Sequence, residues 1–217
     1  MKALFLDLDG TLINSEKAFS NCFVDILNNE YGANVTLHDY KKYELEQNAL
    51  LIEYAKKSNM ISYNISDKEI MSLVYEAYEE YFKDIIKEAE AIDNFRLIRL
   101  LKDKYYLGLI TTCRRHYLDI LDQEEDIYDL FDLVIAREDV KELKPNPEAY
   151  LKALEVLKID PIDALAIDDS KRGIDSSIEA KIKTIKVDNF TEIKYKDPRC
   201  IEEESANKVL RKILNYK

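Results

Sequence analysis

The 217-residue sequence has no tryptophan and contains only four glycines, four prolines and three cysteines. So little glycine and proline excludes a collagen-like chain and argues against a low-complexity one. No apolar stretch approaches the roughly 18 residues that a membrane-spanning helix needs, and no basic segment with a small-residue cleavage site marks the N-terminus. We therefore expect a cytoplasmic protein, and its 47% hydrophobic and 35% charged residues are typical of a folded globular chain.

Basic residues are outnumbered by acidic ones, and cysteine is scarce. The chain has 32 Lys and Arg against 43 Asp and Glu, a formal net charge of −11. This balance disfavours nucleic acid and anionic membranes as partners, since both are bound by basic residues that neutralise phosphates. Any attraction for an anionic substrate must therefore be local. The cysteines, Cys22, Cys113 and Cys200, are odd in number and have no metal-ligand spacing, which predicts reduced thiols.

Short apolar runs alternate with helical patterns through most of the chain. Five runs are too brief for helices and are predicted as buried strands: residues 2–6, 105–111, 130–136, 163–168 and 181–187. Helical spacing predicts helices over residues 94–104, 114–123, 146–158 and 171–181, and a final helix over the C-terminal residues 198–217. Strands that alternate with helices are joined by right-handed crossovers. The predicted fold class is therefore α/β, with a Rossmann-like parallel sheet and helices on both faces.

Residues 14–88 interrupt this alternation, because strand patterns are missing there and helical patterns accumulate. In residues 16–32 apolar residues recur at helical spacing, and Gly32 predicts the end of that helix. A second helix is predicted over residues 66–88, with Ser66 or Asp67 as its N-cap, and Glu69 fits a capping box with Ser66. The chain would cross between core and insertion twice, near residues 12–16 and 84–93, and two crossings make a hinge. The predicted domains are a Rossmann-like core, residues 1–13 and 89–217, and an inserted helical domain, residues 14–88.

A pair of aspartates, Asp7 and Asp9, follows the first predicted strand in the segment FLDLDGTLINSE, residues 5–16. Residues i and i+2 of an extended chain face the same way, so both carboxylates leave the strand in one direction. The carboxyl edge of a parallel sheet is where open α/β folds bind ligands. Gly10 permits a tight turn, and Thr11 adds a hydroxyl. A capped strand end with solvated acids and a divalent-cation site are both compatible with this segment alone.

A second acidic pair, Asp168 and Asp169, ends the fourth predicted strand. Either aspartate, or Ser170 after them, suits the N-cap of the next helix. Since the ends of parallel strands cluster, the two acidic pairs together offer several oxygen ligands, which Mg²⁺ prefers while it keeps waters and substrate phosphate in its shell. Four clustered acids without a cation would repel one another. The sequence therefore predicts Mg²⁺ as a cofactor.

Other strand ends supply groups that suit an anion. The second predicted strand ends in Thr111 and Thr112, two hydroxyls followed by a helix start whose amides can hold phosphate oxygens. Lys144 stands before Pro145 and the next helix, so that restricted backbone fixes its position. A solvated lysine is the simpler interpretation of Lys144 taken alone.

Together these motifs resemble the haloacid dehalogenase superfamily, in particular its phosphatase and phosphomutase branch with a helical cap inserted after the first strand, as in phosphoglycolate phosphatases and beta-phosphoglucomutases. The likeness spans ALFLDLDGTLINSE, LGLITTCRR, LFDLVIAREDVKELKPNPEAYLKALEVL and ALAIDDSKRGIDSSIEAKIKTIKV. It implies a catalytic core and a cap that closes over a small phosphorylated metabolite, in a monomer or weak homodimer. Thr112 stands where Asn is common and Lys181 where a helix-ending Gly is common, so the subfamily stays open.

The resemblance also implies a role for each catalytic candidate. Asp7 would be the nucleophile that forms an aspartyl phosphate. Asp9 would give a proton to the leaving alcohol and take one from the hydrolytic water. Thr111 would bind the transferring phosphoryl group, with Thr112 as a further phosphate-binding candidate, and Lys144 would offset the charge of the phosphoryl group and of Asp7.

Four residues are implied as metal ligands. Asp169 corresponds to the acidic ligand of the family, joined by Asp7 and the backbone carbonyl of Asp9. Asp168 occupies a position that is often Gly but is acidic in sugar-phosphate mutases, and it is the fourth candidate.

The leading hypothesis is a Mg²⁺-dependent phosphatase of a small phosphate monoester, with a phosphomutase of the beta-phosphoglucomutase type as the alternative enzyme. A signalling receiver also combines an acidic pair, a hydroxyl and a lysine, but its phosphoacceptor follows the acidic pair on a later strand, and the order here is wrong for it. A non-catalytic protein that binds phosphate or metal is the remaining alternative.

Overall fold

The computed structural model describes residues 1–44, 48–188 and 197–215, and their side chains except those of residues 41–50. The chain divides into two compact units, Met1–Asn14 with Ile86–Lys217, and Ser15–Ile85. Both boundaries fall within the two connecting stretches that the sequence indicates, but the interpretation of the second unit as a cap stays a prediction. Among the described residues, no helix has the length and apolar character needed to cross a bilayer.

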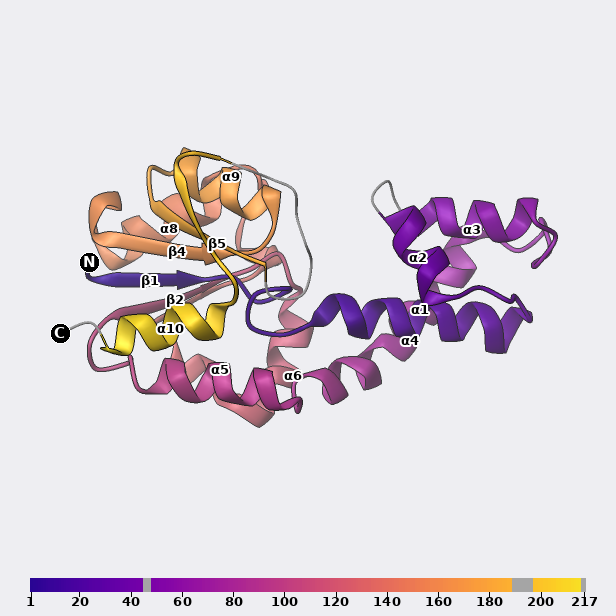
Figure 1. Ribbon diagram of the computed structural model, residues 1–217, viewed down its shortest axis with the longest axis horizontal. Helices are drawn as coiled ribbons and strands as arrows, with labels where there is room; N and C mark the ends of the chain where they lie inside the picture. Colours follow the sequence, from indigo (N-terminus) through magenta and orange to yellow (C-terminus); the bar gives the residue numbers. More distant parts are fainter. Residues whose placement is uncertain (45–47, 189–196, 216–217) are drawn as a thin grey trace. The chain divides into compact units, whose positions relative to one another are not determined.

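A parallel sheet of six strands forms the centre of the first unit, in the order β3-β2-β1-β4-β5-β6 (Figure 1). The strands are β1 (Ala3–Leu6), β2 (Tyr106–Ile110), β3 (Leu133–Ile135), β4 (Ala164–Asp168), β5 (Lys183–Val187) and β6 (Cys200–Glu203). β1 lies in the middle and is fully buried, as expected for a continuous apolar run in a parallel sheet. The predicted α/β class with a Rossmann-like sheet is confirmed.

The edge strand β6 corrects the sequence prediction of five strands and a continuous C-terminal helix. The tail forms β6 first and only then the helix α10 (Ala206–Asn215). β6 has just two apolar residues, Cys200 and Ile201, and Ile201 is 42% exposed. An edge strand of this kind lacks the apolar run and the alternation by which strands are recognised in a sequence.

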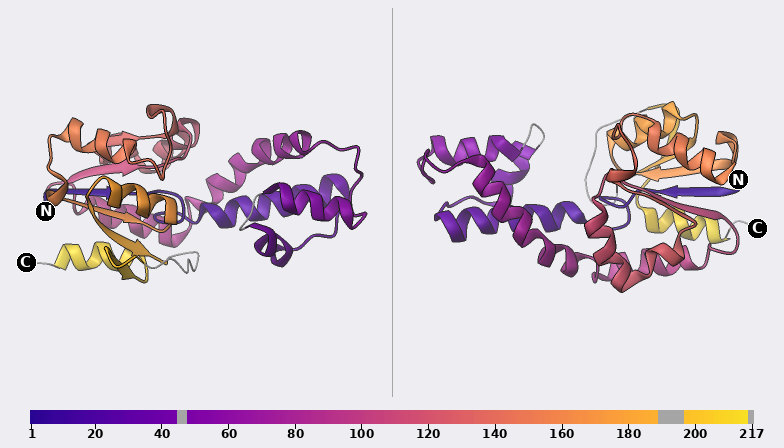
Figure 2. Two further views of the ribbon diagram at one scale, coloured as in Figure 1. Left: turned by 90° about the horizontal axis from the view of Figure 1, so that it is seen from above. Right: turned by 180° about the vertical axis from the view of Figure 1, so that it is seen from behind.

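Helices cover both faces of the sheet, α8 and α9 on one and α5 and α10 on the other (Figures 1 and 2). Besides α10, the described residues of this unit form the α-helices α5 (Ala89–Arg99), α6 (Arg115–Glu125), α7 (Ile127–Leu130), α8 (Glu148–Leu157) and α9 (Lys171–Glu179). The helix predicted over 94–104 is displaced, because Leu101 continues the helical spacing of Leu97 and Ile98 beyond the true end of α5. Under α8, the buried side chains of Phe5, Ile110 and Tyr150 belong to one apolar cluster.

The second unit is helical. It contains α1 (Ser15–Tyr31), α2 (Leu37–Glu44), α3 (Asn48–Lys57) and α4 (Asp67–Ile85), with α1 packed along α4. α1 ends before Gly32, which has a φ of 65°. Ser66 Oγ accepts the Glu69 amide hydrogen at 3.1 Å. The predicted helix end and the N-cap of α4 are therefore confirmed.

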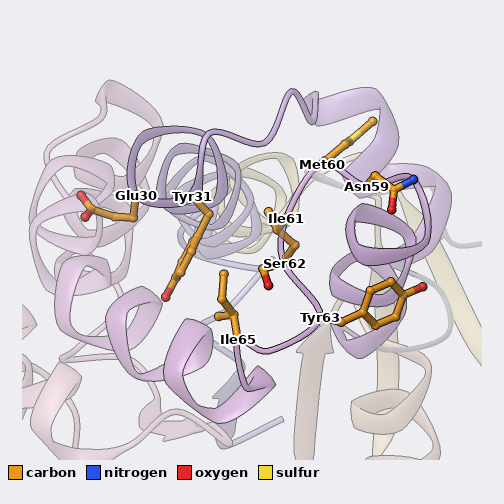
Figure 3. Close-up of a pocket in the computed structure, with 8 residues that line it drawn as sticks. All are labelled: Glu30, Tyr31, Asn59, Met60, Ile61, Ser62, Tyr63 and Ile65. Atoms are coloured by element: carbon orange, nitrogen blue, oxygen red, sulfur yellow. The ribbon is translucent and has the colours of Figure 1, made fainter.

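The loop between α3 and α4 borders a pocket of about 550 Å³ (Figure 3). The lining residues are Glu30, Tyr31, Asn59, Met60, Ile61, Ser62, Tyr63 and Ile65. Among the described residues, the buried Tyr31 hydroxyl has no hydrogen-bond partner, and burial raises its pKa with help from the charges of Glu69 and Glu30. All of the lining residues belong to the helical unit, so the pocket is a feature of that unit alone.

Replacing Lys181 with glycine is expected to stabilise the protein. Lys181 follows α9 with a φ of 64°, a left-handed conformation that costs a side-chain-bearing residue roughly 1–2 kcal/mol. Glycine avoids that cost but loses more entropy on folding, so the net gain in the free energy of unfolding should be roughly 0.5–1 kcal/mol. Urea denaturation measures it. Lys183→Gly, in the extended strand β5, is the control and should lower stability; equal effects of the two changes would contradict the argument.

Candidate active site

The carboxyl ends of β1 and β4 bring three aspartates together. The two strands are parallel neighbours with Leu6 opposite Ile167, and the Asp7 amide donates to the Ile167 carbonyl at 3.0 Å. Asp7 and Asp168 therefore leave the sheet side by side, and Asp169 follows. One carboxylate oxygen of each aspartate lies within 4.8 Å of those of the other two, and all three residues are buried.

Lys144 reaches this cluster from the loop before α8. Its ammonium group donates to Asp7 Oδ1 at 2.7 Å, to Asp168 Oδ2 at 2.8 Å and to the Ile110 carbonyl at 2.8 Å. The residue is only 6% exposed. The simpler interpretation of Lys144 as a solvated lysine is therefore wrong.

Burial and charge oppose each other around Asp7 and Lys144. Burial raises the pKa of Asp7 well above its ordinary value; Lys144 lowers that pKa, while Asp168 and Asp169 raise it further. Burial lowers the pKa of Lys144, but the charges of Asp168 and Asp7 outweigh burial and raise it well above its ordinary value. These shifts favour the cationic form of Lys144, and they make the ionised form of Asp7 less favourable than that of an exposed aspartate.

Gly10 and Thr11 hold Asp169 in place. Thr11 Oγ1 donates to Asp169 Oδ1 at 3.0 Å. Gly10 has a φ of 82°, and a Cβ atom there would lie 2.2 Å from Asp169 Oδ2, so only glycine lets the backbone approach this carboxylate so closely. Burial raises the pKa of Asp169 to about 7, and the charge of Asp168 contributes to the rise.

Asp9 is in contact with the end of β2. Thr111 Oγ1 donates to Asp9 Oδ2 at 3.3 Å and accepts the Cys113 amide hydrogen at 3.0 Å. Thr111 is buried, whereas Thr112, next in the loop before α6, is partly exposed. The structure thus brings the predicted acid–base residue to the predicted phosphoryl-binding hydroxyl. Burial raises the pKa of the free Cys113 thiol, which disfavours a thiolate nucleophile here.

Asp168 accepts hydrogen bonds from two residues, Tyr150 and Ser170, whose contact with it was not predicted from the sequence. Tyr150 donates its hydroxyl to Asp168 Oδ2 at 3.2 Å, and Ser170 donates its amide and its hydroxyl to Oδ1 at 3.0 and 2.9 Å. Ser170 Oγ also accepts the Gly173 amide hydrogen at 3.0 Å and so is the N-cap of α9. The sequence indicated that cap, but nothing distinguished Tyr150 from an apolar core position of α8.

The donor set suits a hard divalent cation. Carboxylate oxygens are the ligands that such cations prefer. The raised pKa values of Asp7 and Asp169 mean that the ionised carboxylates are unfavourable here unless a cation lies beside them. Lys144 and the hydroxyl of Thr111 add groups for an anion at the same sheet edge. The arrangement can therefore hold a cation and a phosphate side by side, as phosphoryl transfer requires. Ligation by Asp168 and by the Asp9 carbonyl stays a prediction.

Known proteins share this sequence pattern and this fold. Residues 4–187 match the family model of haloacid dehalogenase-like hydrolases. The chain is 28% identical to the pyrophosphatase PpaX of Bacillus cereus over 192 residues, which cover 86% of this chain and 83% of the relative. It is similar in fold to a Thermotoga maritima protein assigned as a beta-phosphoglucomutase, with a TM-score of 0.79 and 19% identity over 98% of both chains. CbbY of Rhodobacter sphaeroides, in complex with phosphate, has a TM-score of 0.71 and 20% identity over 96% of both chains.

Proposed function

The chain belongs to the haloacid dehalogenase-like hydrolase family, and on that premise we propose that it is a Mg²⁺-dependent phosphatase that hydrolyses a small phosphate monoester through an aspartyl phosphate on Asp7. The contact that supports this best is the 2.7 Å hydrogen bond from Lys144 Nζ to Asp7 Oδ1. It orients a buried carboxylate at a strand end, beside Asp169.

In the first step, a carboxylate oxygen of Asp7 forms a bond to phosphorus while the bond from phosphorus to the alcohol oxygen breaks. Asp9 gives its proton to the leaving alcohol. Lys144 offsets the charge of the transferring phosphoryl group and of Asp7, and Thr111 binds this group. Bound Mg²⁺, with Asp7, Asp169 and the Asp9 carbonyl as proposed ligands, would neutralise phosphate charge and keep Asp7 ionised.

In the second step, Asp9 takes a proton from a water whose oxygen bonds to phosphorus. The bond between phosphorus and the Asp7 oxygen breaks, which releases inorganic phosphate and restores the Asp7 carboxylate. Because the leaving group of this step is a carboxylate, the displacement is divided into two easier ones. The 3.3 Å hydrogen bond from Thr111 to Asp9 supports these roles, because it brings the proton-transfer residue next to the proposed phosphoryl-binding residue.

A phosphomutase is the second candidate. The acidic residue Asp168 before Asp169, the feature shared with sugar-phosphate mutases, favours it. The name of the pyrophosphatase relatives makes inorganic pyrophosphate the first compound to compare with phosphate monoesters.

A panel of phosphorylated metabolites, sugar phosphates and inorganic pyrophosphate tests the function of the purified protein. We expect phosphate release with Mg²⁺ and none after EDTA treatment, and re-addition of Mg²⁺ should restore the activity. Slow loss of phosphate from the protein together with transfer to a sugar phosphate would favour the mutase. Phosphate release that persists in EDTA would contradict the proposal.

Mg²⁺ is expected to stabilise the protein more at about pH 8 than at about pH 5. The folded-state pKa of Asp169, about 7, exceeds its ordinary value, so its contribution to stability is present at low pH and is lost as the pH rises through 7. A cation bound to the ionised carboxylates offsets that loss but competes with protons at low pH. A saturating excess of Mg²⁺ should raise the Tm by roughly 3–6 °C at the higher pH.

Thermal unfolding in EDTA and in Mg²⁺, at equal ionic strength, measures this difference. Asp169→Asn is the matched variant and should lose most of the Mg²⁺-dependent rise in Tm at both pH values. A rise that is equal at the two pH values would contradict the competition between cation and protons.

A further inference from the structure

Every donor of the Lys144 ammonium is in use. An ammonium group has three N–H donors, and those of Lys144 go to Asp7 Oδ1, the Ile110 carbonyl and Asp168 Oδ2. Asp7 is the proposed nucleophile, and Ile110 contributes only backbone. Besides the proposed nucleophile, Asp168 is therefore the carboxylate that holds this amine.

The carboxylate of Asp168 is itself saturated. Its Oδ2 accepts from Lys144 and Tyr150, and its Oδ1 accepts twice from Ser170. An ionised carboxylate has about four acceptor positions, and Asp168 is 0% exposed. A direct bond to a cation would require Asp168 to give up one of these hydrogen bonds.

Tyr150 fixes Asp168 from inside the core. Its ring is fully buried, 6.2 Å from the ring of Phe5, in a cluster that is otherwise apolar. A buried hydroxyl is costly without a hydrogen bond, and Asp168 Oδ2 supplies the acceptor. Lys144 Nζ lies 5.3 Å from the centroid of the same ring, which is within cation–π range. Tyr150 therefore contacts both Lys144 and the carboxylate that holds it.

Gly173 also lies against the carboxylate of Asp168. A Cβ atom at Gly173 would lie 1.9 Å from Asp168 Oδ2 and 2.1 Å from Oδ1. The first turn of α9 thus comes as close to the carboxylate as a backbone without a side chain allows. Asp168 is confined between α9, Tyr150 and Lys144. A carboxylate held in this way can fix the position of Lys144, but it has little freedom to turn toward a cation.

We propose that Tyr150 is a positioning residue for Lys144, that it acts through Asp168, and that Asp168 holds this lysine instead of binding the cation. The inference rests on the proposed function, in which Lys144 offsets charge on the transferring phosphoryl group. Without the Tyr150 hydroxyl, Asp168 loses a donor and the amine shifts relative to Asp7. A small displacement of a charged group lowers the rate of the chemical step more than the binding of substrate.

Tyr150→Phe tests the first part. We expect kcat to fall roughly 5- to 20-fold with KM and the affinity for Mg²⁺ nearly unchanged. The ¹⁵N NMR signal of the Lys144 amine, assigned from its absence in Lys144→Arg, should shift or broaden. Tyr128→Phe is the control, because it removes a hydroxyl that donates to the exposed carboxylate of Asp119 at 2.7 Å; it should leave kcat and the amine signal unchanged.

Asp168→Asn and Asp169→Asn test the second part by titration of the purified variants with Mn²⁺, followed by electron paramagnetic resonance without substrate. We expect Asp168→Asn to weaken Mn²⁺ binding by about threefold or less, and Asp169→Asn by about 30-fold or more. Equal losses of Mn²⁺ affinity, or a Tyr150→Phe protein with parental kcat and an unchanged amine signal, would overturn the inference. If no phosphorylated compound is turned over, the proposed function fails, while the amine signal and the Mn²⁺ titration still decide the inference.

Discussion

Asp7→Asn is expected to lower kcat by about 10⁴-fold or more, because the amide cannot act as the nucleophile. The change is nearly isosteric, and the Asn side-chain oxygen can still accept the hydrogen bond that Lys144 donates to Asp7 Oδ1 at 2.7 Å. It also removes a buried carboxylate whose pKa is raised by burial and by the charges of Asp168 and Asp169. The variant should therefore stay folded, with a Tm close to that of the parent. Steady-state phosphate release and thermal unfolding measure the two expectations.

Asp9→Asn separates the two steps that Asp7→Asn stops together. With a leaving group that needs no proton, such as p-nitrophenolate, the first step should proceed and the second should be slow. Acid-quenched Asp9→Asn protein should then retain phosphate that hydroxylamine releases, and Asp7→Asn protein should retain none. Phosphate release by Asp7→Asn at the parental rate would remove Asp7 from the mechanism. Asp175→Asn is the control, because its carboxylate pairs with Lys171 at the surface.

The strand ends were the most predictable part of this molecule, for a physical reason. In a parallel sheet the carboxyl ends of neighbouring strands lie at one edge, so residues that follow β1, β2 and β4 must gather wherever those strands pair. Asp7, Thr111 and Asp169 could be assigned to one site without knowledge of side-chain geometry. This assignment does not depend on the exact ends of the helices. The error in the predicted bounds of α5 therefore did not affect it.

The hydrogen bonds behind the site were not predictable in the same way. Lys144 alone suggested a solvated lysine, because burial of a lysine depends on partners that come from distant parts of the chain. Tyr150 lies at an apolar position of α8. Its hydroxyl has a hydrogen-bond acceptor only because Asp168 ends a neighbouring strand. Such pairings are set by the packing of α8 and α9 on the sheet. The edge strand β6 was not predicted for a different reason. It buries so few apolar side chains that its sequence shows no apolar run or alternation.

Lys144→Met is expected to destabilise the metal-free protein by about 3–5 kcal/mol at about pH 8, because it leaves buried carboxylates without their cation. Lys144 is the group that lowers the pKa of Asp7, so its removal raises that pKa further above the value in the unfolded chain. The folded variant then holds a proton that the unfolded chain releases, and its stability falls as the pH rises toward the folded-state pKa. The loss relative to the parent should therefore be smaller at about pH 5.

Urea denaturation in EDTA at the two pH values measures this loss. Lys171→Met is the matched control, because Lys171 pairs with Asp175 at 2.5 Å but its side chain is 62% exposed. Exposed ion pairs contribute little, so this control should match the parent at both pH values. A Lys144→Met protein as stable as the parent at about pH 8 would mean that the buried Asp7 carboxylate does not depend on Lys144. A deficit that does not grow with pH would place the role of Lys144 in packing, since only the loss of its charge makes the deficit follow the ionisation of Asp7.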